Sequence, residues 1–300
     1  MHPPFLTWVA ATRPAFLSVT IAGVCLGLAS SIHDHTFWSI SLALITLMFA
    51  LIAHAGANVI NDYYDALSGC DAANTDRIPP FTGGSRFIQN GLLSTEQTRL
   101  FGYSLLGIVI PAGAWLVLQS GQILLWIGLA GLFCGWSYSA NPLKLQSRGL
   151  GEFIITLAWL CVVLGSAYVQ SRMLNTTALY AGLTYAPLVA NVLFVNQIPD
   201  RIADAAAGKK TLIVRCDASI SPWGSLTLYT LAMIALLLGM MTGALPSIAS
   251  LALIALIPAA IALRALFRNP TDSQQLRIAI PATIITALLF GTLLSVMLIS

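Results

Sequence analysis

The amino-acid sequence predicts an all-α membrane protein that forms a single domain over residues 1–300. Three observations predict this fold class. First, 57% of the residues are hydrophobic and 8% are charged, with a mean hydropathy of +0.84, whereas about 25% of residues are charged in soluble domains. Second, the sequence contains repeated apolar runs of about 20 residues, the length that crosses a bilayer as a helix. Third, the charges gather in every second connection between these runs.

Nine apolar runs are long enough to be predicted as transmembrane helices. They cover residues 14–32, 37–60, 100–118, 121–139, 150–170, 177–198, 223–243, 246–267 and 279–299. The first run lacks the basic segment that begins a signal peptide, so we expect it to be a membrane helix. The connections after helices two, four and six are predicted to form a cytoplasmic cap. These connections are 61–99, 140–149 and 199–222.

The charge distribution predicts the orientation in the membrane. If the N-terminus lies on side one, that side receives 13 of the 14 Lys and Arg residues, and Arg172 falls opposite. The positive-inside rule then places side one in the cytoplasm. We therefore expect an integral protein of the bacterial inner membrane, with a cytoplasmic N-terminus and an external C-terminus. The net charge of +3 gives no indication of a nucleic-acid partner.

Ten of the 11 acidic residues also fall on side one, with Asp34 as the exception. Acids contribute little to topology, so their clustering needs another cause. The first cluster lies at the cytoplasmic end of helix two, where spacings of three and four place polar residues on one helical face. This first stripe consists of Asn58, Asn61, Asp62 and Asp65, and the acids continue with Asp71 and Asp76. His54, one turn earlier, is expected to be a structural residue.

A second stripe lies at the corresponding end of helix six and consists of Asn196, Asp200 and Asp204. Basic residues follow each stripe. They are Arg77 and Arg86 after the first, and Lys209, Lys210 and Arg215 after the second. One stripe alone has a plain explanation, because loop acids often pair with nearby Lys and Arg. Two matching stripes favour a functional site, since acids at the edge of a membrane are costly and usually functional.

The chemistry of these residue types indicates a metal-bound phosphate. Clustered carboxylates raise one another's pKa values unless cations are bound. Mg²⁺ prefers hard oxygen ligands and usually bridges a few carboxylates to substrate phosphates, while Lys and Arg hold the remaining phosphate oxygens. The two stripes therefore predict a diphosphate held through Mg²⁺. The expected metal ligands are Asn58, Asp62, Asp65, Asn196, Asp200 and Asp204.

Two further motifs lie in the predicted cap. Tyr138 lies at the end of predicted helix four, and Lys144 lies in the connection that follows. Taken alone, these residues are typical of a turn with an aromatic belt residue and positive-inside charge. After the first stripe, the run Gly83–Ser85 predicts a turn that can present backbone N–H groups to an anion.

Together these motifs resemble those of the UbiA superfamily of intramembrane prenyltransferases. The matching residues are Asn61-Asp62-Tyr63-Tyr64-Asp65, Tyr138-Ser139-x-x-Pro142, and Asn196-x-x-x-Asp200-x-x-x-Asp204-x-x-x-Gly208-Lys209-x-Thr211. The resemblance covers nearly the whole chain. Within the superfamily, the runs 62–94 and 208–215 are most similar to the 1,4-dihydroxy-2-naphthoate polyprenyltransferases of menaquinone synthesis. The 4-hydroxybenzoate branch is different after the first motif, where 79–86 replaces an Arg-Pro-rich stretch.

The resemblance implies an Mg²⁺-dependent enzyme that transfers a polyprenyl group from an isoprenyl diphosphate to an aromatic quinone precursor, with the prenyl tail between helices and reaching membrane lipid. It also implies roles for the motif residues. The catalytic residues are Asp62, Asp65, Asp71, Asp200 and Asp204. The substrate-binding residues are Asn58, Asn61, Arg77, Arg86, Tyr138, Lys144, Asn196, Lys209, Lys210 and Arg215.

Two other functions stay open from the sequence. The acceptor could be another aromatic ring such as 4-hydroxybenzoate. A cation-coupled membrane transporter would also carry intramembrane acids, but near the bilayer midplane on broken helices. Here the acids lie at helix ends and are followed by basic groups of the kind that hold phosphate, which favours the enzyme.

Overall fold

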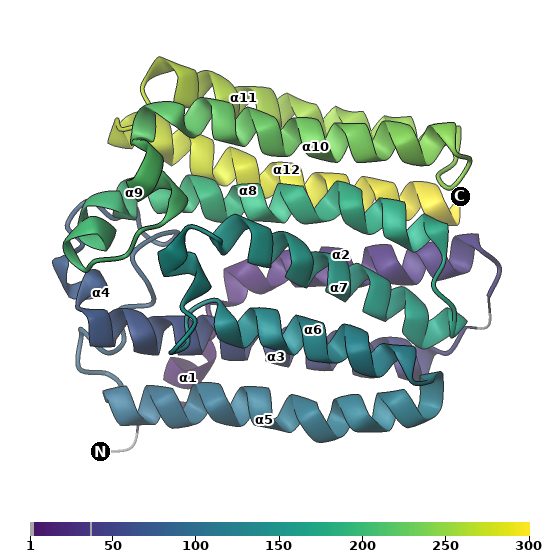
Figure 1. Cartoon of the computed structure of the whole chain (residues 1–300), viewed down its shortest axis with the longest axis horizontal. Coiled ribbons are helices and arrows are strands. Elements are labelled where there is room, and N and C mark those ends of the chain that lie inside the picture. The colour runs from purple at the N-terminus through teal and green to yellow at the C-terminus, as the bar shows by residue number, and fades with distance from the viewer. Residues whose placement is uncertain (1–2, 37) are drawn as a thin grey trace.

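The computed structural model describes residues 3–36 and 38–300, and the regular structure in these residues is helical (Figure 1). The α-helices are α1 Phe5–Ala11, α2 Pro14–His33, α3 Ile40–Ser68, α4 Cys70–Ala73, α5 Thr95–Ser120, α6 Ile123–Ser137, α7 Gly151–Ser171, α8 Thr176–Ala206, α9 Leu212–Cys216, α10 Ser221–Met241, α11 Leu256–Arg268 and α12 Ser273–Ile299. Short 3-10 helices cover Leu145–Arg148, Ala218–Ile220 and Ser247–Ala255.

In the described part of the chain, eight helical segments are long and apolar enough to cross a membrane. They are α2, α3, α5, α7, α8, Ala218–Met241, Ser247–Arg268 and α12. The predicted span 121–139 corresponds to α6, an apolar helix of 15 residues, which is shorter than the ~20 residues that cross a bilayer. The ninth span therefore stays a prediction. The predicted start of the second span, residue 37, lies outside the described residues.

The helices α3 and α8 extend well beyond the apolar runs that predicted them. They contain 29 and 31 residues, which corresponds to about 43–46 Å at 1.5 Å per residue. The hydrocarbon core of a bilayer is only about 30 Å thick. Both helices are therefore longer than this core is thick, and their last three turns contain the two stripes. Gly69 ends α3 in the left-handed conformation, with φ of 76°.

The interior of the bundle is organised around α8. It packs between α7 and α10, and 78% of its most apolar stretch is buried. Tyr185 of α8 is fully buried, and its hydroxyl donates to the Val19 carbonyl of α2 at 2.8 Å. The helices α2 and α7 meet at Gly27, where an added Cβ would lie 2.3 Å from the Val163 carbonyl oxygen. Such small residues allow close helix packing in membranes.

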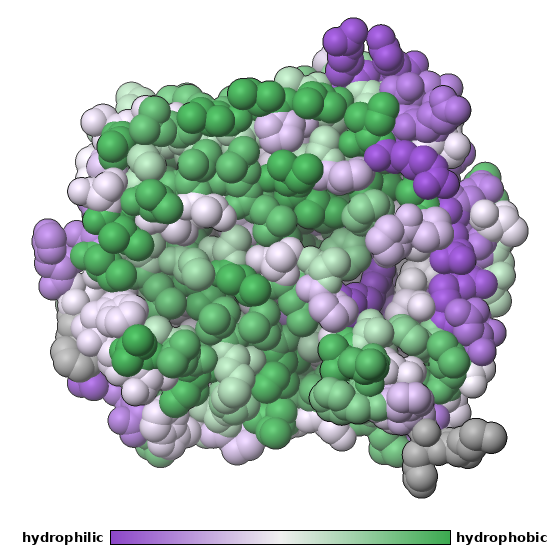
Figure 2. Space-filling view, turned by 180° about the vertical axis from the view of Figure 1, so that it is seen from behind, coloured by the Kyte–Doolittle hydropathy of each residue, from purple (hydrophilic) through white to green (hydrophobic). Residues whose placement is uncertain are grey.

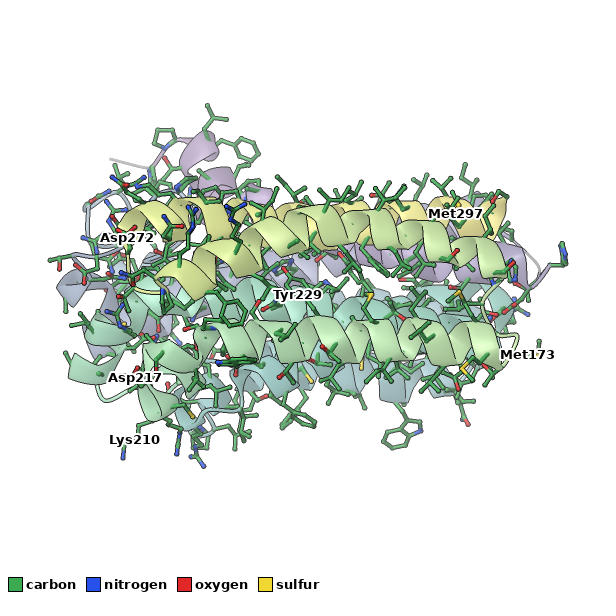
Figure 3. The ribbon with its side chains drawn as sticks, turned by 90° about the horizontal axis from the view of Figure 1, so that it is seen from above. Met173, Lys210, Asp217, Tyr229, Asp272 and Met297 are labelled. Atoms are coloured by element: carbon green, nitrogen blue, oxygen red, sulfur yellow. The ribbon has the colours of Figure 1, made fainter. Side chains whose placement is uncertain are left out.

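Charged residues gather at one end of the bundle, as Figure 2 shows by the hydrophilic residues along one edge and the apolar surface over much of the rest of that face. Figure 3 places Lys210, Asp217 and Asp272 at this polar end and Met173 and Met297 at the opposite end. The connections between α3 and α5, α6 and α7, and α8 and α10 lie at the polar end (Figure 1). The predicted cap thus corresponds to three neighbouring connections, and its assignment to the cytoplasm stays a prediction.

Candidate active site

A cavity of 490 Å³ lies among α2, α3, α5, α6, α7 and α8. One end of the cavity is polar, because residues of both stripes line it where α3 and α8 reach the polar end of the bundle. The rest is walled by apolar side chains from the spanning helices, including Phe49, Ile110, Leu129 and Val162. The cavity can therefore accommodate a molecule with a charged head and an apolar tail.

Three members of the first stripe line the cavity from the last turns of α3, as the helical spacing predicted. They are Asn58, Asn61 and Asp65. The Asn61 amide donates to Asp65 Oδ2 at 3.2 Å and to Ser139 Oγ at 2.9 Å. The Asn58 amide donates to the Thr12 carbonyl at 3.0 Å. These bonds fix the amides, so the amide oxygens keep their capacity to accept a hydrogen bond or to bind a cation.

The whole second stripe lines the cavity from α8. Asn74, which follows α4, donates from its amide to Asp200 Oδ1 at 2.6 Å. Asn196 Oδ1 is buried and has no hydrogen-bond partner among the described residues. A buried carbonyl oxygen without a partner is costly, so this atom is available to a ligand. The two stripes thus meet across one cavity although they are more than 130 residues apart.

The turn Gly83–Ser85 lies between the stripes and donates to both of them. The Gly83 N–H donates to Asp200 Oδ2 at 3.2 Å, and the Ser85 N–H donates to Asp62 Oδ2 at 3.2 Å. Both glycines have positive φ, 77° at Gly83 and 70° at Gly84, a conformation that favours glycine. The sequence predicted that this turn presents N–H groups to an anion. In this structure these two N–H groups bind carboxylates of the two stripes.

Lys209 connects the two stripes through a buried ion pair. Its Nζ lies 2.6 Å from Asp65 Oδ1 and 3.3 Å from Asp204 Oδ1, and 7% of the residue is exposed. Burial alone would lower the pKa of Lys209, but the two carboxylates raise it well above its ordinary value. The side chain is therefore a fixed positive charge, held at the point where both stripes can share one cation.

The site fits Mg²⁺ in a restricted way. Among the described residues, no group of three His, Cys, Asp or Glu side chains could hold a metal ion. Mg²⁺, however, usually takes one or two carboxylates and completes its shell with waters and substrate phosphates. The Lys209 ammonium shows that a cation can reach a carboxylate from each stripe at once, and the unpaired Asn196 oxygen adds a hard ligand. The residues present thus fit a metal bound together with a diphosphate.

Asp71 also lines the cavity, from the short helix α4. The residue is 3% exposed. Burial, together with the nearby charges of Asp65 and Asp62, raises the pKa of Asp71 to about 7. The Arg86 guanidinium donates to the Asp71 backbone carbonyl. Arg86 therefore supports the segment that contains Asp71 and does not itself line the cavity.

The remaining sequence-predicted residues are divided between the cavity and its surroundings. Tyr138 and Lys209 line the cavity. Asp62 is buried beside it and is held by Ser85 and by Arg13. The basic residues Arg77, Arg86, Lys144, Lys210 and Arg215 lie outside its wall. Lys210 and Arg215 are exposed, and Arg215 donates to the Lys210 carbonyl.

Arg13 is a site residue that sequence reasoning used only for topology. It precedes α2 with a positive φ of 57°, lines the cavity, and places Nη1 3.9 Å from Asp62 Oδ1. Its guanidinium also lies 5.1 Å from the centre of the Phe16 ring. The sequence offered only a lone cation just before the first predicted membrane helix, with no indication of its contact with Asp62. Other polar lining residues outside the predictions include Asn74, Gln146 and Gln197.

His54 lines the deeper part of the cavity. Its Nδ1 lies 2.7 Å from Thr20 Oγ1, and its ring packs edge-on against Trp159 with centroids 5.0 Å apart. This packing agrees with the structural role that we expected for His54.

Solved structures share this fold. A UbiA homolog from Aeropyrum pernix K1 superposes with a TM-score of 0.64 at 15% identity, covering 89% of this chain and 94% of that one. A UbiA homolog from Archaeoglobus fulgidus bound to GPP and Mg²⁺ superposes with a TM-score of 0.58 at 17% identity, covering 97% of this chain and 99% of that one. At these identities the likeness shows the fold.

Sequence relatives point to a narrower group. The 1,4-dihydroxy-2-naphthoate octaprenyltransferase of Mycobacterium tuberculosis is 29% identical over 70% of this chain and 70% of its own length. The 2-carboxy-1,4-naphthoquinone phytyltransferase of Synechocystis is 28% identical, over 69% of this chain and 65% of its own length. The match therefore spans just under two thirds of the Synechocystis protein. A model of the UbiA prenyltransferase family matches residues 16–285. The chain therefore belongs to the UbiA prenyltransferase family of transferase enzymes.

Proposed function

We propose that this protein catalyses the Mg²⁺-dependent transfer of a polyprenyl group from an isoprenyl diphosphate to 1,4-dihydroxy-2-naphthoate, as a step of menaquinone synthesis. One observation carries the proposal. Two stripes of carboxylates and amides face the polar end of one cavity whose other walls are apolar. A prenyl diphosphate has the same division, with a multiply charged head and a hydrocarbon tail.

The donor fits the cavity in one orientation. Its diphosphate lies between the stripes, where Lys209 and Arg13 provide positive charge, and its tail lies between the spanning helices. The reverse orientation would bury several phosphate charges among apolar side chains, which is prohibitively costly. The homolog from Archaeoglobus fulgidus, which was solved with GPP and Mg²⁺, supports this choice of ligand class.

The chemistry follows from the same division. Mg²⁺, when bound, supplies positive charge to the diphosphate as it departs. Lys209 and Arg13 hold phosphate oxygens through charged hydrogen bonds and stabilise the same developing charge. The bond between the allylic carbon and the diphosphate oxygen breaks, and a bond forms to an electron-rich ring carbon. Either a carboxylate of the site or the departing diphosphate takes the ring proton. When the attacked position carries a carboxylate, CO₂ leaves in place of that proton.

The apolar walls contribute to this reaction by excluding water. A prenyl cation in contact with water would be hydrolysed, and an enclosed apolar chamber prevents that side reaction. A transporter is less consistent with the site, because its acids would lie near the middle of the helices. Here both stripes occupy the last turns of α3 and α8, at the polar end of the bundle.

Three observations support the naphthoate acceptor. The relatives named above are a naphthoate prenyltransferase and a carboxynaphthoquinone phytyltransferase. The runs 62–94 and 208–215 are also most similar to the naphthoate branch. The polar groups Tyr138, Gln146 and Gln197 line the cavity close to the second stripe. These groups can orient ring hydroxyls.

A side-by-side assay tests the acceptor. The purified protein is incubated with one prenyl diphosphate, Mg²⁺, and either 1,4-dihydroxy-2-naphthoate or 4-hydroxybenzoate. We expect prenylated naphthoquinol with one CO₂ released per transfer. Turnover of 4-hydroxybenzoate without turnover of the naphthoate would overturn the acceptor and leave prenyl transfer intact. Absence of prenyl transfer to either ring would overturn the proposed reaction.

A further inference from the structure

A second, smaller cavity of 90 Å³ lies at the polar end of the bundle. Its wall is formed by the end of α3, the connection between α6 and α7, and the connection after α8. Lys144, which lies outside the wall of the large cavity, lines this small one together with Ser139 and Ser147. We name it the cap cavity. Its rim includes the exposed residue Gly208, so it reaches the surface of the polar end.

The cap cavity adjoins the large cavity. Asp65, Gln146 and Lys209 line both, so they form the wall between the two. Lys209 is held in this wall by Asp65 and Asp204, at 2.6 and 3.3 Å. A group that leaves the diphosphate position between the stripes can therefore stay in contact with Lys209 as it enters the cap cavity.

The lining of the cap cavity is suited to an anion. Lys144 and Lys209 provide two positive charges, and Asp65 is the acidic residue that faces them. Asp65 is already paired with Lys209, so the charge that remains unpaired is that of Lys144. Tyr64 also lines the cavity, and its hydroxyl pairs with Tyr103 at 3.0 Å.

Ser139 adds a directed donor. Its Oγ accepts hydrogen bonds from the Asn61 amide at 2.9 Å and from the Gln146 amide at 3.2 Å. A hydroxyl has two acceptor positions and one O–H, so both acceptor positions are used and the O–H remains to donate. Ser139 is 2% exposed and lines the cap cavity but not the large one. The buried Ser139 O–H and the partly exposed Lys144 side chain thus provide two donors in the lining of the cap cavity.

We propose that the cap cavity is a second binding site for inorganic diphosphate, independent of metal, through which the leaving group passes to the water-facing side of the protein. This inference rests on the proposed prenyl transfer, which produces one inorganic diphosphate in each cycle. The apolar end of the large cavity cannot accept a multiply charged anion. The cap cavity lies beside Lys209 and outside the prenyl chamber, so a leaving group that passes Lys209 would stay among polar groups.

Metal dependence separates the two sites. Without Mg²⁺, the stripes present carboxylates that repel a diphosphate, whereas the cap cavity presents Lys144 and a hydroxyl donor. The probe is radiolabelled inorganic diphosphate, bound to the full chain in nanodiscs of phosphatidylcholine. We expect one diphosphate per chain in EDTA and a second in excess Mg²⁺. Absence of binding in EDTA would contradict the proposal.

Matched variants locate the metal-independent site. Lys144→Gln should weaken diphosphate binding in EDTA by about tenfold, the effect of one charged hydrogen bond. Arg148→Gln is the control, because Arg148 lies on the same connection, is exposed and lines neither cavity. Ser147→Ala, a milder change in the same wall, should weaken binding less but in the same direction. Equal losses in Lys144→Gln and Arg148→Gln would indicate general surface charge and overturn the proposal.

Two further arms identify the source of the anion and separate the two hypotheses. If adding phosphatidylglycerol to the nanodiscs displaces the EDTA-resistant diphosphate, the cavity holds a lipid headgroup and the proposal fails. Binding does not require turnover, so it can be measured even if no acceptor is prenylated. Prenyl transfer without binding of diphosphate in EDTA would overturn the proposed cap site and leave the proposed reaction intact. Binding of diphosphate in EDTA without prenyl transfer would overturn the proposed reaction. It would also overturn the role of the cap cavity in release of the leaving group.

Discussion

The substitution Lys209→Gln removes a buried cation that holds one carboxylate from each stripe. The Lys209, Asp65 and Asp204 side chains are 8%, 12% and 5% exposed. Removing one partner of a buried ion pair costs about 3–5 kcal/mol, because the remaining charge is left buried without compensation. We therefore expect the metal-free variant to lose about this much stability relative to the metal-free wild type.

Mg²⁺ should restore part of that loss, because it offers the two carboxylates another cation. In the wild type a metal ion must displace Lys209 from Asp65 and Asp204, whereas in the variant these carboxylates are free. Mg²⁺ should therefore raise the unfolding temperature more in the variant than in the wild type. In the proposed site the variant would also lack a charged hydrogen bond to the donor, worth about 1.5–3 kcal/mol. The KM for the isoprenyl diphosphate should rise about 10- to 100-fold.

The assay is thermal unfolding followed by tryptophan fluorescence, in EDTA and in Mg²⁺, together with steady-state kinetics of prenyl transfer. Lys210→Gln serves as the control for stability, because Lys210 is adjacent in sequence but exposed. The reasoning would be refuted if Lys209→Gln were as stable as the wild type in EDTA and showed an unchanged KM for the donor.

Four further predictions concern the rest of the site and the membrane orientation. Replacing any single stripe carboxylate by an amide should lower the rate of prenyl transfer at least about 100-fold, while the chain still inserts into the membrane. Near wild-type turnover in two of these variants would contradict the assignment of the stripes as metal ligands. These variants are Asp62→Asn, Asp65→Asn, Asp200→Asn and Asp204→Asn. Chelation with EDTA should abolish prenyl transfer by the wild type, and added Mg²⁺ should restore it; transfer that persists in EDTA would remove the need for a metal. Gly84→Ala should reduce activity more than the control Gly91→Ala. Both glycines have positive φ, but a Cβ on Gly84 would lie 2.4 Å from Asp71 Oδ2, whereas a Cβ on Gly91 meets no atom of the described residues within 4 Å. Equal activities of the two variants would show that the contact with Asp71 is unimportant. A reporter fused after Ser300 should be found outside the cytoplasm, given the 13-to-1 distribution of basic residues, and a cytoplasmic reporter would mean that one predicted span is wrong.

The local parts of the site could be predicted from the sequence because helical periodicity is local. Spacings of three and four placed Asn58, Asn61 and Asp65 on one face of α3, and the structure has them lining one cavity. Apolar run lengths predicted the long spans for the same reason. The exception is α6, which ends at Ser137 although the apolar run continues to 139. Its 15 residues form a shorter apolar helix than the spans require.

The non-local parts could not be predicted. Arg13 approaches Asp62 because the joint between α1 and α2 packs beside α3, and nothing in the spacing of these residues indicates that contact. Arg86 follows the first stripe as a phosphate-binding residue would. The two left-handed glycines before it redirect the chain, however, and its guanidinium reaches the Asp71 carbonyl instead of the cavity. The shared wall at Lys209 depends on how three connections meet, which the sequence order does not reveal.

Because of the turn Gly83–Ser85, the site becomes ordered when the chain folds and not when a donor binds. Its backbone N–H groups bind Asp200 and Asp62, so the long connection between α3 and α5 is anchored at both stripes. The conformational entropy of these residues is therefore lost when the chain folds and is not lost again when a donor binds. The proposed prenyl diphosphate would therefore bind to a connection that is already held at both stripes. An insertion within this turn would leave every carboxylate in the sequence, yet binding would then have to order the connection anew.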